Sequence, residues 1–186
     1  MDFVTIDFET STYSQNSACS IGLVKFNNGK VIDSYYSLIR PPRLYIRPDF
    51  TEIHGLTVDD VRDSPNFFEL WDSAILPFIE KYPLAAHNAI FDKGVLKGVL
   101  EHYEIDVPKL SFFCSCEIAR RTWKNLKSHA LTALAKNFKI VYEAHNALDD
   151  AKTCGKIILL AAEKHGCKSV EELLSKTGLR MSKLVQ

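Results

Sequence analysis

The chain has 186 residues, of which 46% are hydrophobic and 25% charged, a composition typical of one globular domain. Lys and Arg together number 23, as do Asp and Glu, so the formal net charge is zero. This balance argues against a protein that wraps a long nucleic acid backbone without regard to sequence. The longest apolar run is too short to span a bilayer and no signal peptide is recognisable, so we expect a cytoplasmic protein without a membrane partner.

The N-terminal part of the chain is predicted to form three antiparallel strands. Val4, Ile6 and Phe8 alternate with polar residues, which is the period of a half-buried strand. A second apolar run, over 21–26, leads into the sequence Asn-Asn-Gly, which is typical of a hairpin turn. The return strand is expected over 30–40.

Further along the chain, helices and strands are predicted to alternate. Ser64 and Pro65 are expected to begin a helix that ends near Lys81, because serine favours the N-cap and proline the first helical turn. The later strands are expected over 84–86 and 110–113, and the later helices over 95–103 and from about residues 116, 130, 147 and 170. This order predicts an α/β domain with a mixed sheet.

Asp7 and Glu9 form the first candidate site. They lie two residues apart in the first predicted strand, so their side chains point to the same face. Neighbouring carboxylates at the end of a buried strand repel each other unless a cation neutralises them, and Mg²⁺ and Mn²⁺ prefer oxygen ligands. The alternative is an ordinary polar face exposed to solvent.

Asp92 is the second candidate. It is expected in the first turn of a helix that follows a short strand, the place where open α/β sheets build their sites. Alternatively, Asp92 interacts only with the helix dipole and Asn88 serves as the N-cap.

The third cluster lies over residues 145–150. Asn146 is expected to cap a helix, which places His145 in the preceding loop and directs Asp150 inward. Asp149 is rotated by about 100° and is expected to face solvent. Histidine near metal ions suits a general base, although an ordinary loop histidine fits the sequence equally well.

Together these motifs resemble those of the DEDDh 3′–5′ exonucleases, a family of the RNase H-like superfamily that includes RNase T and the proofreading ε-type domains of DNA polymerase III. The Asp-x-Glu-Thr motif is matched by 7–10, and the Asn-x-x-Phe-Asp motif by 88–92. The third motif, a histidine separated from an aspartate by four residues, is matched by 145–150, and the His-Gly-Leu-Thr segment at 54–57 resembles a fourth. The resemblance covers about residues 2–165.

The resemblance implies an RNase H-like fold with a five-stranded mixed sheet flanked by helices. It implies an exonuclease domain over 1–166, followed by a short C-terminal helix and tail over 167–186. We expect the basic residues of that tail to be solvated and frayed, namely Lys176, Arg180 and Lys183.

The family also implies a mechanism. Two divalent ions, Mg²⁺ or Mn²⁺, would be held by four acids, Asp7, Glu9, Asp92 and Asp150, and His145 would accept the proton of the attacking water. The product would be nucleoside 5′-monophosphates released from the 3′ end of single-stranded DNA, or of RNA. A DNA polymerase or a repair protein is a possible partner.

Contacts with the terminal nucleotide are implied for four residues, Thr10, His54, Asn88 and Phe91. The helical period by itself favours a core position for Phe91. Many relatives have Thr-Gly-Leu where this chain continues after Thr10 with Ser-Thr-Tyr, so the path of residues 11–17 is left open. Arginines 40, 43 and 47 alternate with Tyr45 in a way that could steer a single strand, but a solvated proline-rich loop is the favoured interpretation.

Two other functions fit the same residues. One is a proofreading or binding partner of a polymerase, in which hydrolysis is secondary. The other is a phosphodiesterase that acts on short oligonucleotides such as short RNA. Both would use the same five site residues, so the motifs alone do not separate them.

Overall fold

The computed structural model describes residues 1–79, 81–106 and 109–184. The strands are β1 (Phe3–Thr10), β2 (Ala18–Asn27), β3 (Lys30–Leu38), β4 (Leu84–Ala86), β5 (Ser111–Cys114) and β6 (Ser182–Lys183). The helices are α1 (Pro48–His54), α2 (Val58–Val61), α3 (Phe67–Leu70), the π-helical turn η1 (Trp71–Ile75), α4 (Leu76–Ile79), α5 (Ala89–His102), α6 (Ser115–Thr122), α7 (Leu131–Asn137), α8 (Ala147–His165) and α9 (Val170–Thr177).

The described strands form one mixed sheet in the order β3-β2-β1-β4-β5-β6. The first three strands are antiparallel, as predicted, and β4 and β5 add to β1 in parallel. The predicted α/β fold with a mixed sheet flanked by helices is therefore confirmed, but the sheet has six strands where five were expected.

The sixth strand comes from the tail that was expected to be frayed. Lys183 is the antiparallel register partner of Ser111 in β5, and the Leu184 N–H donates to the Leu110 carbonyl at 2.9 Å. The Leu184 side chain is buried in the core, which explains why this end of the chain is held in place. Two residues are too few to show a strand period in sequence. Residues 185 and 186 of the predicted tail lie outside the described residues.

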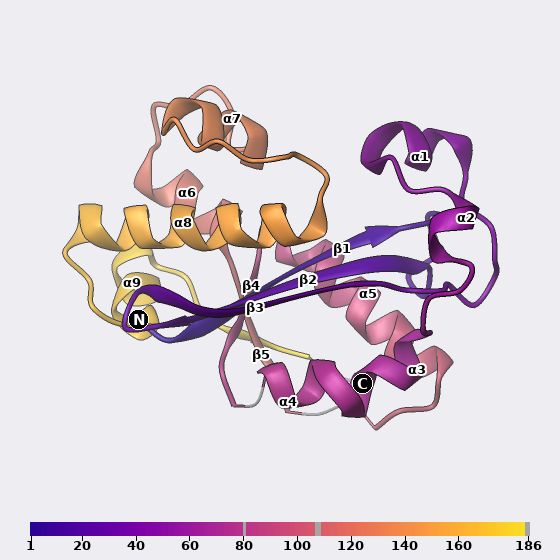
Figure 1. The fold of residues 1–186 in the computed structure, drawn as a ribbon. Helices are drawn as coiled ribbons and strands as arrows, with labels where there is room; N and C mark the ends of the chain where they lie inside the picture. Colours follow the sequence, from indigo (N-terminus) through magenta and orange to yellow (C-terminus); the bar gives the residue numbers. More distant parts are fainter. Residues whose placement is uncertain (80, 107–108, 185–186) are drawn as a thin grey trace.

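Each face of the sheet is covered by its own layer of helices (Figure 1). On one face, β1 residues Val4, Ile6 and Phe8 pack with apolar side chains of α3, η1, α4 and α5. On the other face, Phe3 and Phe26 pack with α6, α8 and α9. The alternation predicted for β1 therefore corresponds to a strand buried on both sides, and its polar residues at positions 5, 7 and 9 face α8.

The helix predicted from Ser64 begins later than expected. Its N-cap is Asn66, whose side chain accepts from the Glu69 N–H at 3.0 Å while the Glu69 carboxylate accepts from the Asn66 N–H at 2.7 Å. This reciprocal capping box satisfies two backbone donors, and Ser64 remains in the preceding turn. The π-helical turn η1 comes just before Pro77, which has no N–H to donate to the previous turn. Residue 80, within the predicted end of this helix, lies outside the described residues.

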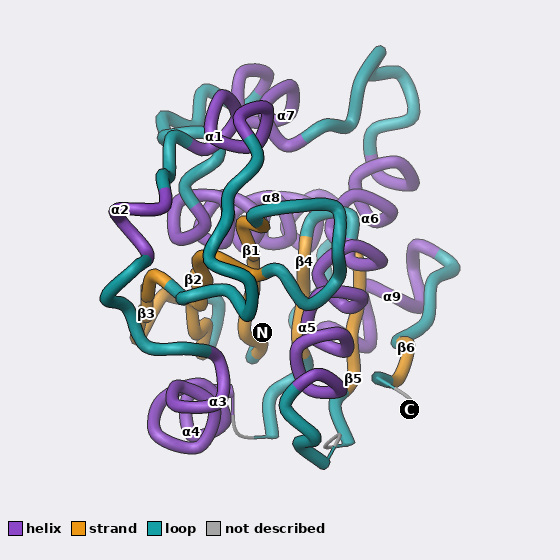
Figure 2. The backbone as a smooth tube through the Cα atoms, turned by 90° about the vertical axis from the view of Figure 1, so that its right-hand side faces the viewer, coloured by secondary structure: helices purple, strands orange, loops and turns teal. Residues whose placement is uncertain are grey.

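The carboxyl end of β1 and the amino end of α8 meet at one edge of the molecule. Figure 2 looks at this edge, where the loop after β1 and the segment that leads into α1 pass in front of the sheet. None of the helices within the described ranges combines the length and apolarity that crossing a bilayer requires.

Candidate active site

β1 carries two of the acids to the edge of the sheet. Strand β4 pairs with β1 only at Val4 and Thr5, so beyond Thr5 this side of β1 is free to bind side chains from other elements. Asp92, in the first turn of α5, uses that space. Its Oδ1 accepts a hydrogen bond from the Phe8 N–H at 3.1 Å, and its side chain is buried. The backbone of β1 thus fixes Asp92 between the strand positions of Asp7 and Glu9.

A close approach of backbones brings α8 to the same place. Gly22 is the register partner of Asp7 in β2, and a Cβ added at Gly22 would lie 2.2 Å from the Ala147 carbonyl oxygen. Only glycine leaves room for the first residue of α8 to rest on the sheet at this point. Asp150, one turn further along α8, therefore lies beside β1.

The loop before α8 has the conformation that the sequence predicted. The Asn146 side chain accepts from the Asp149 N–H at 3.3 Å and caps the helix. His145 lies outside the helix with a φ of 63°, a left-handed conformation that few residues other than glycine adopt. Its N–H donates to Asp150 Oδ2 at 2.8 Å, which ties the histidine to the acid.

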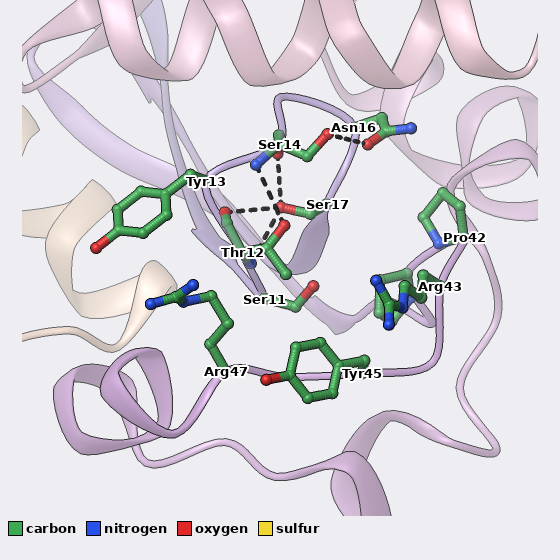
Figure 3. A pocket seen from close by; sticks show the side chains of 11 residues that line it. Ser11, Thr12, Tyr13, Ser14, Asn16, Ser17, Pro42, Arg43, Tyr45 and Arg47 are labelled. Atoms are coloured by element: carbon green, nitrogen blue, oxygen red, sulfur yellow. Dashed lines mark hydrogen bonds between the residues drawn. The ribbon is translucent and has the colours of Figure 1, made fainter.

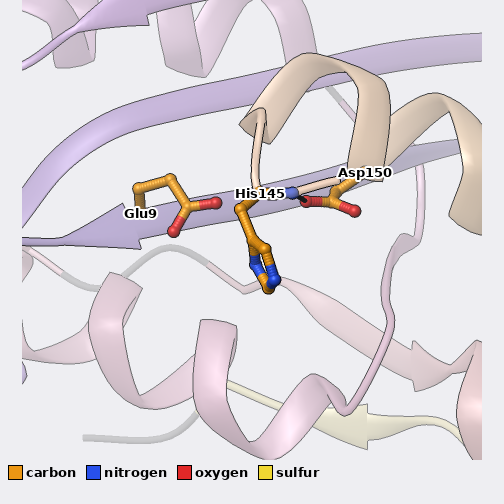
Figure 4. A group of neighbouring side chains, drawn as sticks. All are labelled: Glu9, His145 and Asp150. Carbon is orange, nitrogen blue, oxygen red and sulfur yellow. Dashed lines mark hydrogen bonds between the residues drawn. The ribbon is translucent and has the colours of Figure 1, made fainter. Parts of the chain in front are cut away.

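Three of the predicted site residues converge directly. One potential ligand atom from each of Glu9, His145 and Asp150 lies within 4.8 Å of the others (Figure 4). Asp7 and Asp92 belong to the same electrostatic cluster, because both carboxyl groups interact with Asp150. The structure thus brings together all five residues that were predicted to carry the chemistry.

Burial and mutual repulsion favour the protonated forms of these acids. Burial, and then repulsion from Asp92, Asp150 and Glu9, raises the pKa of Asp7 well above its usual range. Burial and the neighbouring acids raise the pKa of Glu9 to about 8. Burial also raises the pKa of Asp92 to about 7 and that of Asp150 to about 6, although both accept backbone hydrogen bonds that oppose the shift. A divalent cation would relieve this repulsion, so the donor set fits an oxygen-ligated metal.

Asp149 differs from its neighbour Asp150. Partial burial raises its pKa, but the Glu143 N–H and Lys152 outweigh that effect, and the net pKa is lowered. Its Oδ2 accepts from Glu143 at 3.1 Å, and its Oδ1 lies 3.3 Å from the Lys152 Nζ. Asp149 is therefore a charged, paired carboxylate, which matches its predicted place away from the cluster.

The residues predicted to contact substrate are divided between two cavities. Thr10, Asn88 and Phe91 line a cavity of about 390 Å³. The period-based expectation of a core position for Phe91 is wrong, because its side chain is 47% exposed. Asn88 occupies the N-cap position of α5 with a φ of 72°, but its side chain makes no capping hydrogen bond. It is thus free to face a ligand.

His54 lies in the second cavity, of about 310 Å³, which Glu9 and His145 also line. Its Nε2–H donates to the Thr10 carbonyl at 3.2 Å, and its Nδ1 accepts from the Leu56 N–H at 3.0 Å. Burial lowers the pKa of His54, which favours the neutral form of the ring. Both nitrogens are bound to backbone, and His54 shapes the wall of the cavity while it holds the end of β1.

Sequence reasoning missed several residues of the site. Tyr13 and Phe50 line the same cavity as Phe91, and their rings pack edge to face with centroids 4.9 Å apart. Tyr142 lies near the acids, since repulsion from Asp150 and Asp7 adds to burial in raising its pKa to about 12. No periodic or motif signal marks these aromatic residues, because they come from loops and short helices that only the fold brings together.

Comparison with known proteins identifies the family of the chain. The model of the RNase_T exonuclease family matches residues 4–158. A DNA polymerase III subunit epsilon from Buchnera aphidicola subsp. Baizongia pistaciae is 31% identical over 169 residues, which covers 83% of this chain and 68% of that protein. A PolC-type DNA polymerase III from Caldanaerobacter subterraneus subsp. tengcongensis is 30% identical over 180 residues, which is 94% of this chain but 13% of that much longer protein.

Solved structures share the fold. Exonuclease X in complex with 5′-overhanging duplex DNA superposes with a TM-score of 0.74 at 24% identity and covers 95% of this chain and 99% of that one. The nuclease domain of 3′hExo, a DEDDh family member bound to rAMP, superposes with a TM-score of 0.77 at 18% identity, covering 97% and 96%. The family match and the sequence relatives show that the chain belongs to the DnaQ-like exonuclease family.

Proposed function

We propose that the protein is a metal-dependent 3′–5′ exonuclease that releases nucleoside 5′-monophosphates from single-stranded nucleic acid, with DNA favoured over RNA. The observation that carries the proposal is the convergence of Glu9, His145 and Asp150 at the carboxyl end of β1. Membership of an exonuclease family and the similarity to a DNA polymerase III subunit epsilon support the reaction and the preference for DNA.

The four acids Asp7, Glu9, Asp92 and Asp150 would hold two divalent ions, Mg²⁺ or Mn²⁺. When bound, such ions supply positive charge that activates water and stabilises the leaving oxygen. The protein contributes a rigid donor set, since Asp92 is fixed by the Phe8 N–H and Asp150 by the His145 N–H. Held in this way, the carboxylates need little rearrangement when they bind cations.

His145 would act as the general base. It lies in a loop, is exposed, and places a ring nitrogen near the carboxylates of Glu9 and Asp150. From this position the imidazole can accept a proton from water that attacks the last phosphodiester. Asp150 holds the histidine backbone in its left-handed conformation and thereby sets the direction of the ring.

The cavity lined by Thr10, Asn88 and Phe91 would receive the terminal nucleotide. Its half-exposed phenylalanine offers a face on which any base can stack, and Asn88 offers an amide for hydrogen bonding. Sequence-tolerant stacking of this kind suits an enzyme that removes nucleotides one after another.

The test is cleavage of 5′-labelled single-stranded DNA and of RNA with the same sequence, with Mg²⁺, with Mn²⁺ and with EDTA. The variants are Asp150→Asn and its neighbour Asp149→Asn, which changes the same group one position away. We expect a metal-dependent ladder that shortens from the 3′ end, that Asp150→Asn abolishes and that Asp149→Asn leaves within about tenfold of wild type.

The outcomes separate the competing functions. Cleavage of only the shortest oligonucleotides would favour a phosphodiesterase for short substrates. Folded protein that binds metal and DNA but cleaves neither substrate would favour a polymerase-associated binding partner. A larger loss from Asp149→Asn than from Asp150→Asn would contradict the assignment of ligands.

A further inference from the structure

A third cavity lies beside the candidate active site and has no part in the chemistry described above. Its volume is about 480 Å³, and it is lined by segments 11–17 and 41–47 (Figure 3). We call it the arginine cavity. Arg47 and Tyr13 lie at one end of it and Arg43 at the other, with Ser11 and Thr12 between them.

The arginine cavity combines cationic and hydroxyl-bearing side chains with prolines and aromatic rings. It includes two arginines and a series of hydroxyl groups but no Asp or Glu. Arg47 is bound at 2.9 and 3.1 Å by Asp49, which lies outside the lining. Arg43 forms no ion pair within the described residues, and its guanidinium lies 5.2 Å from the ring centroid of Tyr45. The cavity thus offers an unneutralised cation next to a partly exposed aromatic ring.

Segment 11–17 is held in one shape by its own hydrogen bonds. The Ser17 hydroxyl donates to the Ser14 carbonyl at 2.6 Å or the Thr12 carbonyl at 2.9 Å, and it accepts from the Thr12 N–H at 3.2 Å. The segment rests on α5, where a Cβ added at Gly98 would come within 2.6 Å of Gln15. A wall fixed in this way loses little entropy when a ligand binds.

The arginine cavity adjoins the cavity proposed for the terminal nucleotide. Both are lined by Thr12, Tyr13 and Ser14, so they lie on either side of this short stretch. The centroid of the Tyr13 ring lies 4.9 Å from the centroid of Phe50 and 4.9 Å from Cζ of Arg47. The Tyr13 hydroxyl donates to Asp49 at 3.3 Å, so the ring is held in place. A nucleic acid whose 3′ end lies in the first cavity therefore passes close to the second.

We propose that the arginine cavity binds a second nucleotide of the nucleic acid substrate, with its phosphate at Arg43 and its base against Tyr45. Guanidinium groups bind phosphate oxygens in a fork, and aromatic rings stack on any base. The proposal rests on the proposed function, because it extends the substrate site of the same enzyme. The nucleotide comes either from the strand being degraded or from an opposing strand that overhangs it.

The experiment compares one small substrate with long ones. The 4-nitrophenyl ester of thymidine 5′-monophosphate reports on the catalytic centre alone, whereas oligonucleotides of increasing length and a duplex with a 5′ overhang can reach the arginine cavity. The variants are Arg43→Gln and Tyr45→Leu. Arg40→Gln is the matched control, because it removes the same charge from the residue just before segment 41–47, outside the cavity lining.

We expect Arg43→Gln and Tyr45→Leu to raise KM about tenfold for substrates that reach the cavity, with kcat and hydrolysis of the ester unchanged. Arg43→Gln should also lower the salt dependence of binding by about one counterion. An effect on single strands above a certain length would assign the nucleotide to the degraded strand, and an effect on the overhanging duplex alone would assign it to the opposing strand.

The proposal is overturned if KM stays unchanged for every substrate, or if Arg40→Gln has the same effect as Arg43→Gln. It is also overturned if the variants slow hydrolysis of the ester equally, since that would show a general disturbance of the site. Failure of the proposed function is a separate result, in which the wild type hydrolyses neither ester nor oligonucleotide. Fluorescence anisotropy of labelled DNA in EDTA then still tests the arginine cavity.

Discussion

At the scale of single residues, two adjacent aspartates have opposite properties. Burial raises the pKa of Asp150 to about 6 although the hydrogen bond from the His145 N–H opposes the shift, whereas Asp149 is paired with Lys152 and has a lowered pKa. The difference arises because α8 turns by about 100° for each residue, so one acid faces β1 and the other does not. A bound cation would favour the ionised form of Asp150, whereas Asp149 already has the ammonium group of Lys152 beside it.

His145 gives the first residue-scale prediction. Replacing His145 with Ala should lower kcat by about a hundredfold or more, because the proposed general base is lost. The affinity for Mn²⁺, measured by isothermal titration calorimetry, should change little, since the four carboxylates remain. Asp92→Asn is the contrasting variant and should weaken metal binding. If His145→Ala weakened Mn²⁺ binding as strongly as Asp92→Asn, His145 would be a metal ligand and not the base.

The predicted acids and His145 differ from the cavity-lining aromatic residues in how the sequence marks them. The acids and His145 have fixed spacings within short segments, and the structure brings them together. The helical period alone was wrong for Phe91, because it describes which face is buried against a core, and Phe91 at the start of α5 lines a cavity. Tyr13 and Phe50 meet only through the fold, and nothing local marks them.

At the scale of elements, the position of α8 on the sheet decides whether the site forms. Its first residue rests on Gly22, and further along, a Cβ added at Gly155 would lie 2.1 Å from the Phe26 ring. Both glycines allow the helix to approach the sheet closely. They differ in what lies nearby, since Gly22 is the partner of Asp7 and Phe26 is the partner of Phe3 at the other end of β1.

Gly22→Ala should therefore have a larger effect on kcat than on the free energy of unfolding. The new methyl group meets the Ala147 backbone, so the first turn of α8 must move and carry Asp150 with it. We expect a loss of about 1–3 kcal/mol in unfolding free energy, as for other overpacked cores, and a large loss of kcat in the protein that remains folded. Gly155→Ala is the control, with a similar loss of stability but a smaller loss of kcat. Equal kcat values for the two folded variants would argue against this role of Gly22.

Element prediction succeeded for most strands and helices, including the three-residue strand β4, but it missed two short helices. The strands β1 to β3 and the helix α8 were predicted within a few residues because each shows several periods. The helices α1 and α2 were not predicted, although Pro48 at the first turn of α1 and the capping box of Thr57 and Asp60 mark their starts. With seven and four residues, neither helix is long enough to show a hydrophobic period.

At the scale of the whole molecule, the buried acids of the candidate site lower the stability of the folded protein. Burying several carboxylates together is unfavourable, and the rest of the core must compensate. The unfolded chain exposes these acids, whose pKa values then lie near 4. In the folded protein they are about 6 for Asp150, about 7 for Asp92 and about 8 for Glu9. The metal-free folded protein therefore binds more protons than the unfolded chain between these limits.

The sign of the pH dependence follows from this difference. Stability falls with rising pH wherever the folded state binds more protons, so the metal-free protein should lose stability between about pH 4 and pH 8. Bound cations replace the protons and have higher affinity once the acids are ionised. Added Mg²⁺ or Mn²⁺ should therefore raise the melting temperature more at pH 8 than at pH 5, by several degrees at saturating metal.

Thermal melts in EDTA and in excess metal, from pH 5 to pH 8, provide the measurement. Asp7→Asn is the internal control, because it removes a buried carboxyl group whose pKa is raised well above its usual range. This variant should melt at a higher temperature than wild type in EDTA at pH 8, lose less stability across the pH range, and gain less from metal, while its nuclease activity disappears. A wild-type melting temperature in EDTA that rose with pH would contradict the mutual repulsion of these acids. It would also remove the physical reason for expecting cations at the end of β1.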